Sequence, residues 1–317
     1  MSDENLAEIR NEKAKKIQHP KGKLTAYERL NLLLDEGSFS EIDQHVASEE
    51  NPEGEAVITG TGTIHGRPVF VFSEDFSVMG GSLGEVVAKK ILKIMDHALE
   101  ARAPIIGIKD SGGARIQEGI SSLFGYAQIF KKNVEASGKV PQISVVVGPS
   151  AGGAVYSPAL TDFIFQVKDI GQLYVTGPAV VKTVTGEDVT FEELGGVEAH
   201  GTKSGVTHQV CETEEQAFEE IRYLMSFLPQ SSSQKPPMFI TEDEPSRVID
   251  SLDSFIPENR NQPYDMEKII LDIVDDGEHY PIQSNYATNI ITSFTRINGN
   301  TTGIVANQPM ELAGVLD

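Results

Sequence analysis

The sequence PIIGIKDSGGARIQEG, residues 104–119, joins a short apolar run to a glycine-rich turn. The same order recurs in QISVVVGPSAGGAVYSPAL, residues 142–160, and more briefly around Leu173–Thr176. Each apolar run has the length and β-branched composition of a buried strand, and the first two turns lead into segments with helical spacing of apolar residues. Strands that alternate with helices predict an α/β layered fold, whose ligands often bind beyond the carboxyl ends of the strands.

Besides a basic surface helix at Leu6–Ile17, the first third of the chain predicts two helices and a hairpin. Thr25–Glu28 has the sequence of a capping box, so we expect a helix to begin there. Residues 57–72 hold two β-rich runs with a turn at His65-Gly66, which is typical of a hairpin. Ser82–Glu85 is a second capping-box sequence and predicts the start of another helix.

The composition of the chain shifts near residue 230. Glu214–Leu228 has the spacing of an amphipathic helix, and a segment rich in serine, proline and glutamine follows it. Helical spacing resumes at Tyr264. We therefore predict a first domain over residues 1–230, a linker over 231–263, and the beginning of a second domain over 264–317.

The bulk composition excludes several function classes. The 317 residues include 26 Lys and Arg against 47 Asp and Glu, a net charge of −21, and such an acidic surface repels phosphate backbones. We therefore expect no nucleic-acid partner. The single cysteine, Cys211, allows neither a disulfide framework nor a cysteine-rich zinc site, and it fits a reducing cytoplasm. The charged start lacks the core of a secretory signal, and the longest uncharged stretch, residues 140–161, contains proline and glycine, so we expect no membrane segment.

The two glycine-rich turns have a chemical use if they lie close together. Glycine lets the backbone approach a ligand, and the N-terminus of a helix leaves N–H groups unpaired. One N–H from each turn could bind a single carbonyl oxygen that becomes negatively charged as an enolate forms. Such an oxyanion hole is worth about 3 kcal/mol for each donor. The alternative is that the glycines serve only to form tight turns, and spacing alone does not separate the two interpretations.

The second turn also fits a different chemistry. Gly148–Gly152 has the pattern of a nucleophile elbow, between a strand and a helix, with Ser150 as the nucleophile. A serine hydrolase also needs a downstream histidine, and the candidates are His200, His208 and His279. None of them stands in a sequence that marks it as catalytic, and this interpretation leaves the first turn without a role.

Long blocks of sequence around these turns match one known family. The blocks are residues 75–82 (DFSVMGGS), 110–119, 148–161, 176–178, 183–189, 193–196, 286–289 and 303–309. With these blocks in this order, the chain resembles the carboxyltransferase β-subunit family of biotin-dependent acyl-CoA carboxylases, of the propionyl-CoA carboxylase and methylmalonyl-CoA carboxyltransferase type. The split bacterial acetyl-CoA carboxylase β subunit is similar but carries a four-cysteine zinc ribbon, which a chain with one cysteine cannot form.

The resemblance implies a crotonase-like fold, the ββα superhelix of the ClpP/crotonase class, built twice. The first copy binds acyl-CoA, and the second copy, from a partner subunit, receives carboxybiotin. Since the chain ends within what resembles the first strands of the second copy, we expect a C-terminally truncated protein with one complete copy. The residues implied for the oxyanion hole are Gly112, Gly113, Ala114, Gly152 and Gly153. Those implied for contacts with CoA are Gly80, Gly81, Arg115 and Ala151, with Arg115 expected to be either a CoA contact or a structural one.

The resemblance also implies a mechanism and partners. Carboxybiotin releases carbon dioxide, the biotin ring takes the α-proton of the acyl-CoA, and the enolate attacks the carbon dioxide. Acyl-CoA, with propionyl-CoA favoured, is then the substrate, and no metal is expected in this chain. Biotin arrives on a separate carrier, so the implied partners are biotin carboxylase and biotin carboxyl carrier subunits, with a homohexamer for a full-length chain. A non-catalytic CoA-binding module is a further alternative for a truncated chain.

Overall fold

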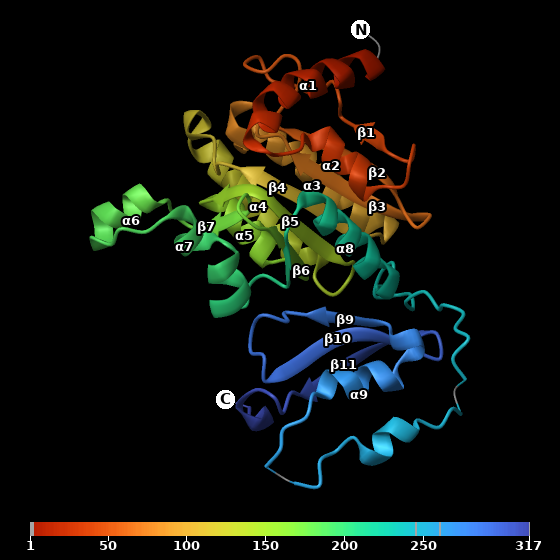
Figure 1. Cartoon of the computed structure of the whole chain (residues 1–317). Coiled ribbons are helices and arrows are strands. Elements are labelled where there is room, and N and C mark those ends of the chain that lie inside the picture. Colours follow the sequence, from red (N-terminus) through yellow and green to blue (C-terminus); the bar gives the residue numbers. More distant parts are fainter. Residues whose placement is uncertain (1–2, 245, 260, 317) are drawn as a thin grey trace.

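The computed structural model describes residues 3–244, 246–259 and 261–316 (Figure 1). Its main sheet has eight strands in the order β1-β2-β3-β4-β5-β6-β8, with β7 beside β5. The strands from β1 to β3 pair antiparallel, and the pairs from β3 onward are parallel. The bounds are β1 Ser40–Ile42, β2 Val57–Ile64, β3 Arg67–Glu74, β4 Ile105–Ser111, β5 Gln142–Ala151, β6 Phe163–Val167, β7 Gln172–Tyr174 and β8 Gln209–Cys211.

Helices cover both faces of this sheet, which confirms the predicted α/β layered fold. α2 (Ala26–Leu33) and α8 (Glu214–Phe227) pack on one face, and α3 (Glu85–Ala101) and α4 (Ile120–Ala136) pack on the other. Figure 1 shows α6 standing away from this body. The remaining helices before residue 228 are α1 (Asp3–Gln18), α5 (Gly153–Ala159), α6 (Pro178–Thr185) and α7 (Phe191–Gly195).

Of the three capping and turn signals in the first third of the chain, two were correct and one was wrong. The capping box of Thr25 and Glu28 forms as predicted, and the hairpin turns at His65 and Gly66, whose φ angles of 52° and 71° suit a tight two-residue turn. The second predicted capping box is absent, because α3 begins at Glu85 without a side-chain cap. Instead, the carboxylate of Glu118 accepts a hydrogen bond from the N–H of Glu85 at 2.6 Å.

The chain after α8 forms a smaller C-terminal unit, residues 266–307, that packs against the body (Figure 1). Its strands pair in the order β11-β10-β9. Among the described residues between α8 and α9, the only helical element is a 3-10 turn at Asp250–Ser254. The bounds are α9 Met266–Ile273, β9 His279–Ile282, β10 Ile290–Ile297 and β11 Asn300–Asn307.

Aromatic contacts join the C-terminal unit to the body. Tyr280 is part of the main apolar core, and the ring of Phe294 lies 6.1 Å from that of Phe163 and 6.2 Å from that of Phe227. The guanidinium of Arg296 lies 4.2 Å from the centre of the Phe227 ring. No helix of the described residues is long and apolar enough to cross a membrane.

Candidate active site

The two glycine-rich turns meet at the carboxyl ends of β4 and β5. Ser111 pairs with Ser150 across these strands. A Cβ atom built on Gly113, whose φ is +100°, would lie 2.6 Å from the carbonyl oxygen of Ala151. The backbones of the two turns are therefore in direct contact, and the spatial convergence that the sequence left open is present.

Three of the five predicted donors are already paired within the chain. The N–H of Gly112 donates to the carbonyl of Gly80 at 2.9 Å, and that of Gly152 donates to the carbonyl of Tyr174 at 3.1 Å. The N–H of Gly113 donates to Oγ of Ser111 at 3.1 Å. These three amides shape the turns and are not free to bind a ligand in this structure.

The other two predicted donors, Ala114 and Gly153, stand one in each turn. Within the described part of the chain, neither N–H has a hydrogen-bond acceptor. Gly153 is the first residue of α5, so its unpaired N–H is that of a helix N-terminus, as predicted. Ala114 is not at a helix N-terminus, because a 3-10 turn intervenes and α4 begins only at Ile120. The N–H of Ala114 instead belongs to a loop, where Ala114 forms an isolated β-bridge with Leu83.

Gly153 has no room for a side chain. A Cβ atom there would lie 2.6 Å from Cδ2 of Tyr126, a residue of α4 that is 4% exposed. Burial raises the pKa of the Tyr126 hydroxyl, so this group stays protonated. Tyr126 therefore packs against the second turn as an uncharged side chain.

The residues predicted to contact CoA lie around the first turn. Gly81 has φ +67°, and a Cβ atom on it would lie 2.1 Å from the carbonyl oxygen of Asp110. Its own carbonyl accepts a hydrogen bond from Oγ of Ser111 at 2.6 Å. The Gly80 and Gly81 carbonyls thus accept hydrogen bonds from the first turn and hold its backbone. Ala151 ends β5 and touches Gly113 through its carbonyl.

Arg115 is engaged within the chain. Its guanidinium forms ion pairs with Glu55 at 2.8 Å and with Glu118 at 2.9 Å, and it also contacts Ser82. Although burial opposes the charge, the two carboxylates raise the pKa of Arg115. The side chain is 3% exposed, so this structure shows a structural contact for it.

A buried ionic cluster lies beneath the turns, and sequence reasoning missed it. Its centre is Asp110, which is 0% exposed and accepts hydrogen bonds from Gln18 at 3.0 Å, Lys23 at 2.7 Å and Arg29 at 2.9 Å. Arg29 also pairs with Glu214 at 2.5 Å. The partners of Asp110 stand 81 to 92 positions away in sequence, so no local pattern could indicate the cluster.

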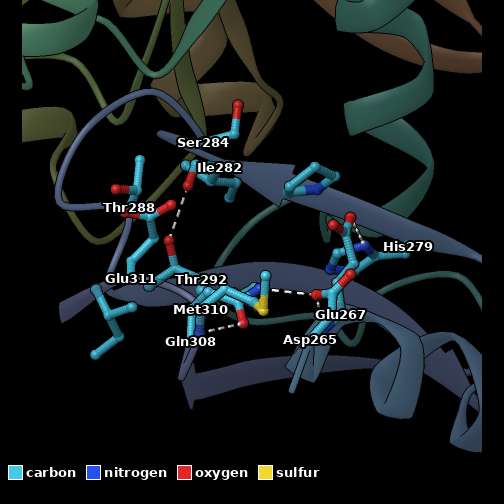
Figure 2. Close-up of a pocket in the computed structure, with 13 residues that line it drawn as sticks. Asp265, Glu267, His279, Ile282, Ser284, Thr288, Thr292, Gln308, Met310 and Glu311 are labelled. Atoms are coloured by element: carbon cyan, nitrogen blue, oxygen red, sulfur yellow. Dashed lines mark hydrogen bonds and ion pairs between the residues drawn. The ribbon is translucent and has the colours of Figure 1, made fainter. Parts of the chain in front are cut away.

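The serine-hydrolase arrangement is not present among the described residues. Ser150 is buried within β5, and its hydroxyl has no partner in that part of the chain. His200 contacts the Leu173 carbonyl and Ser204, and Nδ1 of His208 accepts from the N–H of Ile164. Figure 2 shows the third candidate, His279, beside Glu267 in a separate cavity of about 320 Å³ in the C-terminal unit. None of the three histidines, all of which the structure describes, is bonded to Ser150.

Comparison with known proteins places this geometry in a family. The family described as "Carboxyl transferase domain" matches residues 17–317. This chain belongs to the carboxyl transferase domain family. The propionyl-CoA carboxylase beta chain of Cereibacter sphaeroides is 56% identical over 308 residues, which are 95% of this chain and 60% of that protein. Methylmalonyl-CoA decarboxylase subunit alpha of Veillonella parvula is 52% identical, over 99% of this chain and 64% of that protein.

A solved structure extends the likeness of this carboxyl transferase domain to three dimensions. Transcarboxylase 12S, with methylmalonyl-coenzyme A and methylmalonic acid bound, is 44% identical with a TM-score of 0.94; the match covers 99% of this chain and 64% of that one. The predicted crotonase-like fold and the predicted family are thus confirmed. The chain spans about 60% of the length of the curated relatives it matches. Among the described residues, no group of three or more His, Cys, Asp and Glu could hold a metal ion.

Proposed function

We propose that this chain binds a short acyl-CoA, propionyl-CoA first among them, and holds its thioester oxygen for biotin-dependent carboxyl transfer. The observation that carries the proposal is the pair of unpaired N–H groups of Ala114 and Gly153, which stand on two turns in direct contact. Loss of the α-proton moves an electron pair onto the thioester oxygen. Two donors aimed at that oxygen stabilise the enolate, which then forms the new carbon–carbon bond to carbon dioxide.

The chain's own contribution in this proposal is binding and orientation. Ala114 and Gly153 donate to the oxygen, while Gly112, Gly113 and Gly152 shape the turns. Gly80, Gly81 and Ala151 support the turn backbones beside the CoA path. Carboxybiotin on a separate carrier would supply the carboxyl group and the base for the α-proton. The two unpaired amides form one donor pair, which we assign to the thioester, so we place no residue of this chain at the biotin ring.

The names of the relatives support the finer parts of the proposal. The name propionyl-CoA carboxylase beta chain, which two relatives carry, supports propionyl-CoA as the substrate. We propose biotin carboxylase and biotin carboxyl carrier subunits as partners because the family resemblance implies them. Transcarboxylase 12S is described as a hexamer assembly, which supports a homo-oligomer. We also propose a cytoplasmic protein, an acyl-CoA domain over residues 1–230, a linker over 231–263, and part of a second carboxyltransferase domain over 264–317.

A binding comparison tests the proposed function. Propionyl-CoA and the propyl thioether of CoA differ at one carbon, where the thioether has CH₂ in place of the carbonyl whose oxygen the two amides would bind. If each hydrogen bond contributes about 1 kcal/mol, the thioether should bind at least about tenfold more weakly by calorimetry. Equal affinities would contradict the proposal. Labelling of Ser150 by a fluorophosphonate probe would favour the hydrolase alternative.

A further inference from the structure

The strand that leads to the second turn is bulged beside Asp110. Lys109 pairs with Val146 and Ser111 pairs with Ser150, so three residues of β5, Val147–Pro149, lie opposite Asp110 alone. A bulge of this kind bends a strand and redirects the residues after it, and bulges are common next to active sites. Here the bulge lies a few residues before Gly153, so it sets where that amide stands relative to the first turn.

The side chain of Asp110 fills the space that the bulge opens. A Cβ atom on Gly148, the middle residue of the bulge, would lie 1.9 Å from Oδ1 of Asp110, so the carboxylate lies directly against the backbone there. The carbonyl of Val147, the first residue of the bulge, accepts a side-chain hydrogen bond. Nη2 of Arg29 donates to that carbonyl at 3.3 Å, while Nη1 of the same guanidinium donates to Asp110 at 2.9 Å.

The backbone of Asp110 is held just as closely on the side of the first turn. Its N–H donates to Oε2 of Glu74 at 2.9 Å, and its carbonyl lies against Gly81. Three segments that form the site therefore touch this one residue: the loop that ends in Gly81, the first turn through Ser111, and the bulge of β5. Asp110 therefore lies between the segments that carry the two turns.

The burial of these charges supports a geometric purpose. Asp110 and Arg29 are each 0% exposed, and an apolar pair of similar size commonly stabilises a protein as well as a buried ion pair does. Directed hydrogen bonds, however, fix positions that apolar contacts leave adjustable. Since the strength of an oxyanion hole depends on donor placement within about 0.5 Å, fixed positions matter at this site.

We propose that the Asp110–Arg29 pair is a positioning device that holds the β5 bulge and so sets the distance between the Ala114 and Gly153 amides. Both residues act through the backbone of β5 and do not touch the acyl-CoA. The inference rests on the proposed function, because it needs a thioester oxygen between the two amides. It assigns the Asp110–Arg29 pair a role in the strength of the oxyanion hole, separate from its contribution to stability.

The test is difference infrared spectroscopy of propionyl-CoA carrying ¹³C at the carbonyl, bound to the 317-residue chain at saturating concentration. Hydrogen bonds from the two amides lower the carbonyl stretching frequency of the bound thioester. We expect Asp110→Asn to bind propionyl-CoA within about tenfold of the wild type and to lose about half or more of the frequency shift. Glu214→Gln is the matched control, because Glu214 pairs with Arg29 but contacts neither turn nor bulge. It should lower stability and keep the full shift.

Each outcome separates the inference from the function. No frequency shift in the wild type would overturn the proposed function itself. A full shift in a folded Asp110→Asn variant would overturn the positioning role and leave the function intact. If Asp110→Asn does not fold, Arg29→Lys keeps the charge beside Asp110 and removes the contact with Val147, and it should also reduce the shift. A full frequency shift in Arg29→Lys would contradict the inference. A reduced frequency shift in Glu214→Gln would also contradict it, because lost stability alone would then explain the weaker hydrogen bonds.

Discussion

β4, which leads into the candidate site, and β11, the outer strand of the C-terminal unit, differ in how far their side chains are buried. β4 is buried at all seven positions, and its last residues include the buried charges of Lys109 and Asp110. In β11 no position is buried, and Val305 is 73% exposed. The candidate site is therefore built inside the body, where buried charges hold the backbone. The C-terminal unit contributes mainly packing, through Tyr280 and Phe294.

The largest effect should come from breaking the buried cluster. Arg29→Ala leaves the carboxylates of Asp110 and Glu214 without their shared cation, and such a loss costs about 3–5 kcal/mol of unfolding free energy. Urea denaturation measures this loss. Lys168→Ala is the control, because Lys168 forms an exposed ion pair with Glu212 at 3.0 Å and should change stability by less than about 1 kcal/mol. Equal effects of the two substitutions would show that the buried cluster contributes no more to the unfolding free energy than an exposed ion pair.

The second prediction concerns pH and a buried lysine on α3. Burial lowers the pKa of Lys90 to about 8, from about 10.4 in an unfolded chain. Between these values the unfolded chain binds more protons than the folded one, so the contribution of Lys90 to stability rises with pH. Relative to Lys90→Met, the wild type should gain about 3 kcal/mol between about pH 7 and about pH 10.5. Denaturant titrations of both proteins measure their unfolding free energies across this pH range. A difference between the two proteins that stayed constant with pH would refute the lowered pKa of Lys90.

The third prediction compares one glycine from each region. Gly153→Val places a branched side chain against the ring of Tyr126, displaces the second turn, and should weaken propionyl-CoA binding by at least about tenfold. Gly303→Ala in β11 is the matched control, because a Cβ atom there meets nothing within 4 Å. It should leave affinity unchanged. Wild-type affinity in a folded Gly153→Val variant, measured by calorimetry, would remove Gly153 from the site.

The smallest effect should come from the exposed side of the C-terminal unit. Val305→Asp replaces a side chain that is 73% exposed, so the unfolding free energy should change by less than about 0.5 kcal/mol. Propionyl-CoA affinity should not change, because the proposed donors lie in the body. A stability loss of several kcal/mol would mean that β11 is covered in solution, and sedimentation would then identify self-association.

Local patterns predicted much of the fold, because they depend on neighbouring residues. The capping box at Thr25, the hairpin turn at His65 and the strand-then-turn units at β4 and β5 follow from spacings of a few positions. The predicted capping box at Ser82 failed for a tertiary reason, since Glu118 satisfies the N-terminus of α3 from another turn. The family resemblance supplied the site residues that the patterns alone left open.

The details of the candidate site could not be predicted from spacing. Which amides remain unpaired depends on acceptors such as the carbonyls of Gly80 and Tyr174, which come from other segments. The bulge of β5 depends on its register with β4, and its support by Arg29 crosses more than a hundred positions. These are long-range relations, and a periodicity of two or of 3.6 residues carries no information about them.

The central claim is that the amides of Ala114 and Gly153, and not their neighbours, bind the thioester oxygen. Nuclear magnetic resonance of the ¹⁵N-labelled chain tests it directly, since an amide proton shifts downfield when it forms a hydrogen bond. Saturating propionyl-CoA should shift the Ala114 and Gly153 amide protons strongly downfield, and the propyl thioether of CoA should not. The Gly112 amide, already bonded to Gly80 at 2.9 Å, should change little with either ligand. Equal responses to the two ligands, or a carbonyl-dependent shift at Gly112 in place of Ala114 and Gly153, would contradict the account.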